Sequence, residues 1–312
     1  MNSYTTNSLI ITGQNLTLNR AMITDFIGYL DVKPKTLETY KRALRQFFKF
    51  LTAEQITQPA RADIIRYRDA LSAKHKATTT QSYLNAVKRF FAFTELTGKY
   101  PDITKTVKNV KVSRGTYRKD YLTADQLNQI LTIMEKDRTT EGLRNAALFR
   151  LTVTGALRTI EIERANIEDL KTRGDNTVLY VQGKGKDEKD TPVIVTGKAE
   201  RALRAYLATR PRAKGDDPLF TSTSNRNLNG RMTTRSISGI IKKAMRNAGF
   251  NSDTLTAHSL RHTAATLNLQ AGAPVEEVQQ FLRHSDISNT MIYAHMLDID
   301  KNQCSGRIDS LI

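Results

Sequence analysis

The sequence predicts a mainly α-helical protein of two domains with a small β-hairpin or sheet. Apolar residues recur at helical spacing through most of the chain. Residues 176–195 break this rhythm and read as two short strands. A basic segment with few large apolar side chains, residues 101–119, separates the two helical regions as a linker would. A length of 312 residues is also about what two domains need.

These observations set the expected boundaries along the chain. The N-terminal residues are mostly polar and are expected to form a flexible arm, and the last residues are expected to form a tail. The expected parts are an arm at 1–16, a helical domain at 17–100, the linker at 101–119, a mixed α/β domain at 120–300 and a tail at 301–312.

Four helices are expected in the first domain, where most of the phenylalanines lie. Lys33-Pro34-Lys35 is expected to separate the first two helices, with Thr36 as the N-cap of the second. A four-helix core is the economical explanation for so many aromatic residues at helical spacing. The expected segments are residues 18–30, 36–51, 62–71 and 78–97.

The second of these helices carries a basic face opposite its apolar one. Lys41, Arg45 and Lys49 align at four-residue spacing, and Arg42 lies beside them. These four residues are the candidate DNA-backbone contacts, since each cation that meets a phosphate releases counterions. A solvated helix face explains the same pattern equally well.

The second domain is expected to begin with a capping box, Thr123 with Gln126. The strands 177–181 and 191–195 are expected to form a hairpin whose charged tip contains Gly183-Lys184-Gly185. The remaining segments follow the helical pattern. They are 142–154, 199–209, 234–248, a helix beginning near Ser259 and a short helix with Ser288 as its cap.

Composition narrows the function. The formal net charge is +17 and the pI is about 9.9, which favours a polyanionic partner, and nucleic acid first. The single cysteine, Cys304, excludes an internal disulfide framework and fits a reducing, cytoplasmic compartment. No segment resembles a signal peptide or a membrane span, so no membrane partner is expected. No acidic cluster, metal-ligand spacing or phosphate-binding loop is present, so no metal and no cofactor are expected.

A basic chain without a metal site or a phosphate-binding loop indicates phosphate chemistry that needs no metal. Arg158 precedes Glu161 by three residues, and His258 precedes Arg261 by three, so each pair is expected on one helix face. Two arginines can grip the non-bridging oxygens of one phosphate, and a tyrosine such as Tyr293 becomes nucleophilic beside cations and a proton acceptor. Each motif alone is more often a salt bridge or a packing residue, and only their conjunction favours catalysis.

Four motifs in this order resemble the boxes of the tyrosine recombinase (phage integrase) family, nearest to its Xer and simple-integrase types. They are Thr154-Gly-Ala-Leu-Arg158 with Glu161, His258-Ser-Leu-Arg261-His262, Leu282-Arg-His284-Ser, and Tyr293. The resemblance covers residues 17–300. It implies a helical core-binding domain that clamps DNA, followed by a tyrosine recombinase catalytic domain.

The resemblance also implies a role for each matching residue. Tyr293 would attack the scissile phosphodiester and form a 3′-phosphotyrosyl link, with His258 assisting proton transfer and Lys184 protonating the leaving 5′-oxygen. Arg158 and Arg261 would stabilise the pentavalent transition state. The other two matches would assist them: His284 by donating to a phosphate oxygen and Glu161 by supporting the site.

The implied partners are double-stranded DNA and three further copies of the chain, in a tetramer on two sites that passes through a Holliday junction. The task would be integration and excision of a mobile element or Xer-like resolution, with the need for a directionality factor left open. The family also suggests that the tail docks on a neighbouring subunit. Alternatives are type IB topoisomerase-like relaxation and a non-catalytic DNA-binding protein.

The chain departs from the family pattern at two places. The choice of the lysine that acts as the hairpin acid stays open. The first box is one residue longer than usual, and Arg283 replaces a usual glycine, where it is expected to contact DNA or face solvent. Lys186 and Lys189 rival Lys184 as the hairpin acid. Two other histidines, His262 and His295, are expected to pack or to support the site and not to take part in the chemistry.

Overall fold

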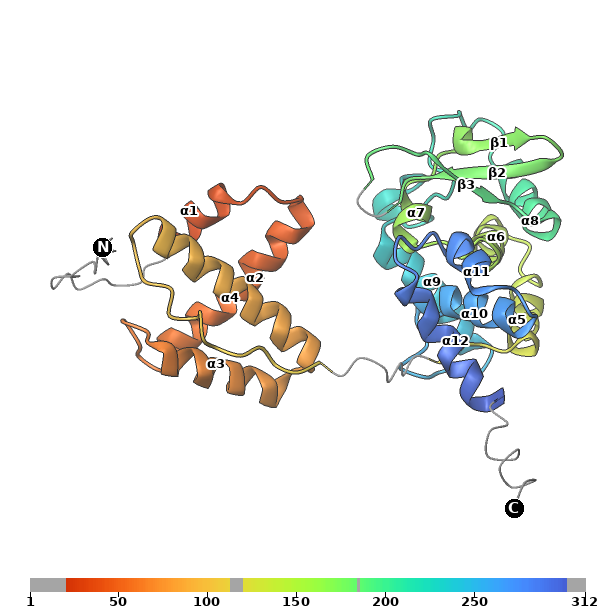
Figure 1. Ribbon diagram of the computed structural model, residues 1–312. Helices are drawn as coiled ribbons and strands as arrows, with labels where there is room; N and C mark the ends of the chain where they lie inside the picture. The colour runs from red at the N-terminus through yellow and green to blue at the C-terminus, as the bar shows by residue number, and fades with distance from the viewer. Residues whose placement is uncertain (1–20, 113–119, 184–185, 302–312) are drawn as a thin grey trace, which may run out of the picture. The chain divides into compact units, whose positions relative to one another are not determined.

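The computed structural model describes residues 21–112, 120–183 and 186–301, which form two compact units (Figure 1). The first unit contains the residues up to 112 and the second contains those from 120 onward. The expected arm, Lys184 and nearly all of the expected tail lie outside the described residues. In the part of the chain that is described, no helix is long and apolar enough to cross a membrane.

The first unit is a bundle of four helices around an aromatic core. The rings of Phe26, Phe47, Phe90 and Phe91 are completely buried, and they meet mostly edge to face, an arrangement that aromatic rings favour. The four expected helices are therefore confirmed, with small shifts of their ends. They are α1 (Ala21–Tyr29), α2 (Pro34–Ala53), α3 (Arg61–Lys74) and α4 (Ala77–Leu96).

Two details of the first unit differ from expectation. The helix α2 begins at Pro34 with Lys33 as its N-cap, so Thr36 is not the cap. Proline suits the first turn because its missing N–H would have no helical partner there. The segment after α4 does not run free as a linker either: Tyr100 and Val107 are buried in the aromatic core, and the Tyr100 hydroxyl donates to the Pro59 carbonyl at 2.8 Å.

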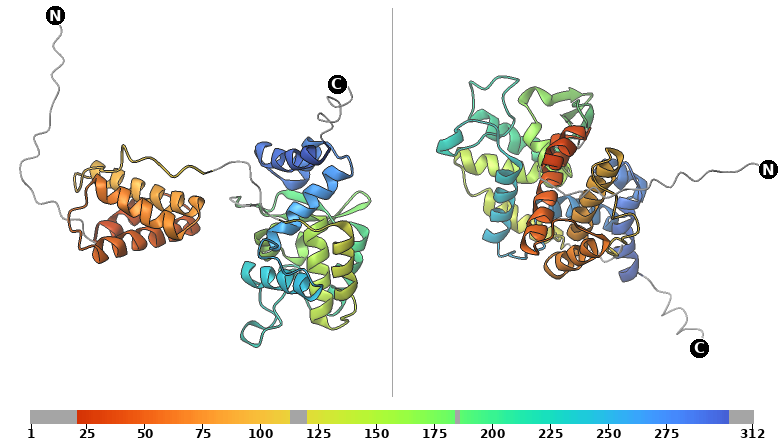
Figure 2. Two further views of the ribbon diagram at one scale, coloured as in Figure 1. Left: turned by 90° about the horizontal axis from the view of Figure 1, so that it is seen from below. Right: turned by 90° about the vertical axis from the view of Figure 1, so that its left-hand side faces the viewer.

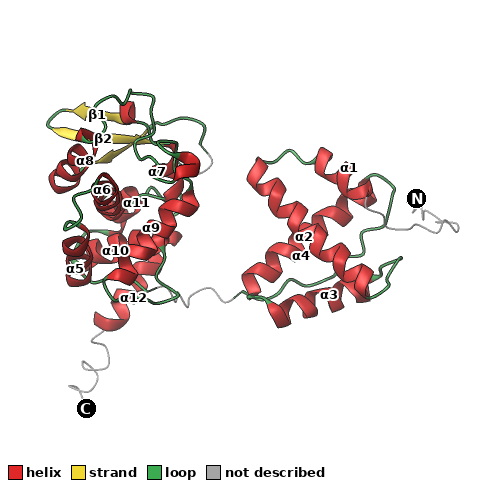
Figure 3. Ribbon diagram, turned by 180° about the vertical axis from the view of Figure 1, so that it is seen from behind, coloured by secondary structure: helices red, strands yellow, loops and turns green. Residues whose placement is uncertain are grey.

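The second unit is mostly helical, with a small sheet at one edge beside α7 and α8 (Figure 3). The expected capping box is confirmed: Thr123 accepts from the Gln126 backbone, and Gln126 accepts from the Thr123 backbone. Its helices are α5 (Ala124–Met134), α6 (Thr140–Thr154), α7 (Thr159–Arg164), α8 (Gly197–Ala208), α9 (Thr234–Asn247), α10 (Ala257–Gln270), α11 (Val275–Leu282) and α12 (Ser288–Lys301), with short 3₁₀ turns at Ile167–Asp169 and Asn225–Asn227.

The sheet has three antiparallel strands in the order β1-β2-β3. Strands β2 (Asn176–Val181) and β3 (Thr191–Ile194) form the expected hairpin, with Val181 opposite Thr191. Strand β1 (Leu170–Arg173) was not expected, because three of its four residues are exposed and give no apolar alternation. Leu179, Val181 and Val193 join the core of the second unit, so the hairpin base is fixed on the helices.

The last three helices pack on one another. Helix α10 contacts both α11 and α12, which also contact each other; the left view of Figure 2 shows these blue helices together. Ser288 is the first residue of α12 rather than a cap ahead of it, and the Asp286 carboxylate accepts from its backbone N–H at 2.9 Å. Helix α10 also contacts α6, whose residues lie more than a hundred positions earlier in the chain.

Candidate active site

The first turn of α10 presents His258 and Arg261. Thr256 begins the helix, and its backbone N–H donates to the Ser259 hydroxyl at 2.9 Å, which fixes the turn. The Arg261 side chain enters the protein and is only 1% exposed, whereas His258 lines an open pocket. The three-residue spacing therefore places one cation inside the protein and one imidazole at its surface.

Arg158 is the N-cap residue of α7, and its extended backbone lies just outside the helix. The expected helical pairing with Glu161 is thus achieved in a different way. The Glu161 carboxylate accepts from the Arg158 backbone N–H at 2.9 Å through Oε2 and from Arg158 Nη1 at 2.8 Å through Oε1. One carboxylate therefore fixes both the main chain and the guanidinium of Arg158.

The extra residue of the first box, Ala156, has a left-handed backbone with φ of 45° and is fully buried. This conformation costs a non-glycine residue about 1–2 kcal/mol. It turns the Ala156 carbonyl toward Arg261, whose Nη1 donates to it at 2.6 Å, while Arg261 Nη2 donates to the Leu282 carbonyl. The departure from the family pattern thus supplies a backbone acceptor that orients Arg261.

Arg283 lies inside the site, so the expectation that it contacts DNA or faces solvent is wrong. Its side chain is 13% exposed and donates to the Glu161 carboxylate at 3.0 Å and to the Ala156 carbonyl at 2.9 Å. The residue caps α11 with a left-handed φ of 55°, and this turn directs the side chain inward. The left-handed end of α11 aims the residue after Leu282 at the core, and no local pattern in the sequence marks this turn.

The buried charges perturb one another. Burial raises the pKa of Glu161, but Arg283 and Arg158 outweigh it, and the net pKa is lowered. Burial, with Arg158 and Arg283 adding repulsion, lowers the pKa of Arg261 to about 9. Both groups therefore remain charged at neutral pH, and three guanidinium groups surround one carboxylate. The excess positive charge suits an additional anion such as a phosphate.

His284 follows Arg283 and remains neutral at physiological pH. Burial lowers its pKa to about 4, and repulsion by Arg261 and Arg158 contributes. Its Nδ1 lies 2.9 Å from the Thr290 hydroxyl. When that hydroxyl donates, the ring proton is on Nε2, which is the tautomer that donates to an incoming oxygen.

Tyr293 is 5% exposed on α12, and its hydroxyl forms a hydrogen bond with His262 Nδ1. The His262 ring lies edge-on to that of His258, with centroids 4.5 Å apart. His262 was expected to pack or to support the site, and it contacts the nucleophile candidate itself. Its position four residues after His258, on the same face of α10, was the signal available in the sequence.

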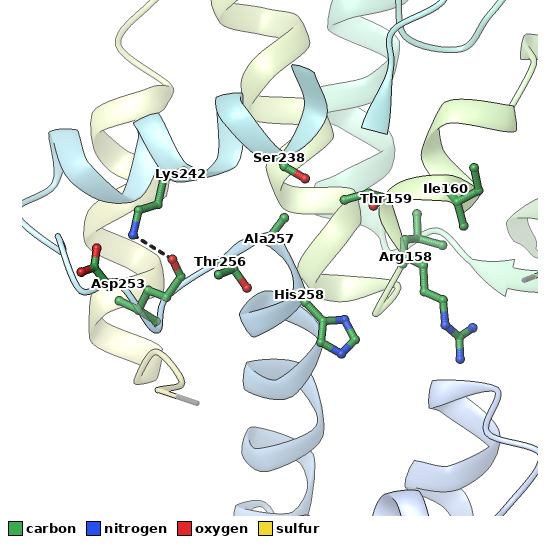
Figure 4. A pocket seen from close by; sticks show the side chains of 11 residues that line it. Arg158, Thr159, Ile160, Ser238, Lys242, Asp253, Thr256, Ala257 and His258 are labelled. Atoms are coloured by element: carbon green, nitrogen blue, oxygen red, sulfur yellow. Dashed lines mark hydrogen bonds between the residues drawn. The ribbon is translucent and has the colours of Figure 1, made fainter. Parts of the chain in front are cut away.

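A pocket of about 580 Å³ opens beside these residues. Arg158 and His258 line it at one end, with Lys242 and Asp253 at the other (Figure 4). Lys242 is bound to the backbone, since its Nζ donates to the Leu255 carbonyl at 2.9 Å. Arg158 and His258 are therefore the arginine and the imidazole that the pocket presents at the end away from Lys242.

The hairpin contributes two described lysines, and both are ion-paired. Lys186 lies 2.9 Å from Asp190, and Lys189 lies 2.5 Å from Asp169, which is itself mostly buried. The preferred acid, Lys184, lies outside the described residues. The structure thus brings together all the other predicted catalytic residues in the second unit: Arg158, Glu161, His258, Arg261, His284 and Tyr293.

The candidate DNA contacts lie in the first unit, on α2. Arg42, Arg45 and Lys49 are exposed, and Lys41 is partly exposed and pairs with Glu38 at 3.0 Å. The opposite face of α2 is buried in the aromatic core. Among the described residues, no group of three or more histidine, cysteine, aspartate or glutamate side chains is placed to hold a metal.

The first unit is a helical bundle, and the second holds a tyrosine close to arginines and histidines. This combination defines the class of tyrosine recombinases, enzymes that cleave and rejoin DNA strands. The family models agree over both units: the phage integrase family matches residues 120–299, and its N-terminal SAM-like domain matches residues 23–98. The chain belongs to the phage integrase family.

Individual relatives support this placement. The chain is 29% identical over 297 residues to the tyrosine recombinase XerC of Thermodesulfovibrio yellowstonii, covering 90% of this chain and 93% of that one. A XerH recombinase bound to a palindromic difH substrate has a TM-score of 0.73 at 18% identity, with 96% and 91% of the chains covered. A lambda integrase tetramer bound to a Holliday junction has a TM-score of 0.67 at 17% identity, with 88% and 77% covered. The two structures are similar to this chain in fold.

Proposed function

We propose that the protein is a site-specific recombinase that cuts and rejoins DNA through a 3′-phosphotyrosyl intermediate at Tyr293. The observation that carries the proposal is the buried tyrosine hydroxyl on His262, within the electrostatic field of Arg261. A phenol has an ordinary pKa near 10 and needs such a setting to act as a nucleophile at neutral pH.

In the proposed reaction, the Tyr293 oxygen attacks phosphorus and its proton passes to a histidine, with His262 and His258 placed for this transfer. The bond from phosphorus to the 5′-oxygen breaks, and Lys184 gives that oxygen its proton. Attack by a 5′-hydroxyl from a partner strand reverses these steps. The phosphotyrosyl link conserves the energy of the phosphodiester, so resealing requires no separate energy source.

The charges around the site support a role in stabilising the transition state. Arg158 and Arg261 would donate to the non-bridging oxygens, and neutral His284 would donate through Nε2 to one of them. Glu161 holds Arg158 at 2.8 Å, so its role is to position that arginine. Fixed donors of this kind typically contribute a factor of about 10²–10³ each in rate.

The ion pairs on the hairpin favour Lys184 as the acid. Lys186 is held by Asp190 and Lys189 by Asp169, so each would have to leave a carboxylate before donating a proton. Lys184 stands between two glycines in the sequence, and glycine permits a close approach of the backbone to a ligand.

The proposed assembly is a homotetramer on two double-stranded DNA sites, with residues 17–100 clamping DNA and 301–312 docking on a neighbouring subunit. The task is Xer-like resolution or the integration and excision of a mobile element, and a relative of the Xer type supports the first. Either task would be carried out on DNA in the bacterial cytoplasm, with or without a directionality factor. Deleting the residues from Cys304 onward should weaken tetramer assembly and spare binding to one site.

Covalent trapping tests the proposal. Nicked suicide duplexes tiled across the DNA that flanks the gene, and duplexes from the host chromosome's resolution region, are incubated with the protein and run on a denaturing gel. We expect a slow adduct that the variant Tyr293→Phe does not form, although it binds the same DNA. The duplex that reacts distinguishes the two tasks.

Two outcomes would contradict the proposal. DNA binding without an adduct on any duplex would indicate a non-catalytic DNA-binding protein. An adduct together with relaxation of supercoiled DNA that lacks a second site would indicate a topoisomerase.

A further inference from the structure

Arg283 makes an unusual set of contacts for a residue at the end of a helix. Its Nη1 donates to the carbonyls of Gly155 at 3.1 Å and Phe281 at 3.0 Å. Its Nη2 donates to the Ala156 carbonyl at 2.9 Å and to Glu161 Oε2 at 3.0 Å. One planar guanidinium thus joins three segments of the chain: the end of α6, the start of α7 and the end of α11.

Two of these four acceptors also bind the arginines that are assigned to the phosphate, Arg158 and Arg261. We call these two acceptors the supports of the arginines. Glu161 holds Arg158, and the Ala156 carbonyl holds Arg261 through Nη1 at 2.6 Å. Arg283 Nη2 contacts both supports from a single nitrogen atom. One nitrogen atom of Arg283 thus links the two supports directly.

The backbone at this position favours a different residue. Arg283 has a φ of 55°, a conformation that glycine adopts at no steric cost and that other residues adopt only with strain. The arginine also places its Nε in a buried position with no hydrogen-bond partner. The hydrogen bonds of the guanidinium must offset the backbone strain and the unpaired Nε. Two of these bonds are made to groups that also hold Arg158 and Arg261.

We propose that Arg283 is a positioning residue for strand cleavage, which ties the support of Arg158 to the support of Arg261 so that both arginines meet one phosphate at a fixed spacing. The inference rests on the proposed function and adds a residue to it. The guanidinium fork is essential in this role, because its two Nη atoms reach four acceptors, while a lysine ammonium offers three donors from a single point.

The test compares Arg283→Gly with Arg283→Lys in the full-length protein. Glycine suits the left-handed backbone, so Arg283→Gly is expected to fold, which circular dichroism and the thermal midpoint will verify. Single-turnover adduct formation on the suicide duplex is expected to be slower by about 100-fold in both variants, the typical effect of misplacing catalytic groups by about 1 Å. Affinity for the uncleaved duplex is expected to change by less than about threefold, since Arg283 is not assigned a phosphate contact.

Chemical rescue separates positioning from a purely structural role. Millimolar guanidinium is added to Arg283→Gly, whose missing side chain leaves room for the free ion, with equal sodium chloride as the salt control. We expect guanidinium to restore part of the rate without moving the thermal midpoint. Arg144→Met is the matched control, because Arg144 is also a buried arginine, 3% exposed, but bonds to the Thr221 carbonyl away from the site. It should lower the thermal midpoint and leave the cleavage rate of the folded protein unchanged.

Each outcome decides something. An adduct that forms at the wild-type rate in Arg283→Gly overturns the inference and leaves the proposed function intact. Full activity in Arg283→Lys would assign the effect to positive charge alone and would also overturn it. If the wild-type protein forms no adduct on any duplex, the proposed function fails, and the inference fails with it.

Discussion

The two units treat charge in opposite ways. In the first unit, none of the buried residues among those described is charged, and the cations of α2 lie on its surface. In the second unit, Arg144, Glu161 and Arg261 are buried, and Arg283 nearly so. The first unit is thus stabilised by burial of apolar side chains. The second unit also has an apolar core, and this core holds buried charges at fixed positions.

The difference has an energetic reason. Burying an aromatic side chain removes apolar surface from water and stabilises the fold by about 25 cal/mol per Å². Burying a guanidinium costs several kcal/mol, which is recovered only when each charge meets a partner. Such partners are present in the second unit. Glu161 pairs with Arg158 and Arg283, and backbone carbonyls accept hydrogen bonds from Arg261. Both units are therefore stabilised by apolar cores, and the second also holds buried charges that are matched by partners.

The largest expected effect concerns the apolar core of the first unit. Phe90 is fully buried and touches the rings of Phe26, Phe48 and Phe91. Phe90→Ala leaves a cavity and should lower the free energy of unfolding of the first unit by about 3–5 kcal/mol. Hydrogen exchange resolved by segment should show faster exchange in α1–α4 and unchanged exchange in α5–α12.

The reciprocal variant is Phe149→Ala, in the core of the second unit, where Phe149 is also fully buried. It should destabilise α5–α12 by a similar amount and leave α1–α4 unchanged. Faster exchange in both units from either variant would contradict the division into two independently stabilised cores.

The same comparison explains how much of the molecule the sequence could predict. Helices α2 to α4 and the capping box of Thr123 depend on neighbours in sequence, and local patterning located them. The direction of the Arg283 side chain depends on the left-handed end of α11 and on a carbonyl more than a hundred residues earlier. No local pattern reports such a contact. For His262, its spacing from His258 marked the shared helix face, but the contact with Tyr293 was not predictable because Tyr293 lies on another helix.

A smaller effect is expected from the titration of His284. Its pKa in the folded protein is about 4, below the ordinary value of 6.5, so the unfolded chain binds the proton more tightly. Between these values the unfolded state carries more protons, and stability is lost as the pH falls from 6.5 to 4. The loss should be about 1 kcal/mol, less than the full shift implies, because His284 is only half-buried.

His284→Asn should remove this part of the acid sensitivity, measured as thermal midpoints between pH 7 and 4. His75→Asn is the control for loss of a histidine, since His75 is exposed at the end of α3 in the first unit. Equal acid sensitivity in wild type and His284→Asn would mean that burial and the charged neighbours do not lower the pKa of His284.

The smallest expected effect concerns the exposed cations of α2. Arg42→Ala and Arg45→Ala should each reduce the slope of log affinity against log salt by about 1 and weaken DNA binding a few-fold, because each removes one phosphate contact. Neither should change the free energy of unfolding by more than about 0.5 kcal/mol, as both side chains are exposed. Lys41→Ala should have less effect than either, since Lys41 already pairs with Glu38.

Lys105→Ala is the matched control, because Lys105 is an exposed cation of the same unit that lies off α2 and pairs with Glu95 at 2.7 Å. Salt slopes that are the same for Arg42→Ala, Arg45→Ala and Lys105→Ala would mean that the α2 face is only solvated. The first unit would then have to contact DNA through another of its surfaces, while its contrast with the charged interior of the second unit would stand. A slope that falls only for the α2 variants would show that the cations excluded from the first core are the ones that face the phosphates.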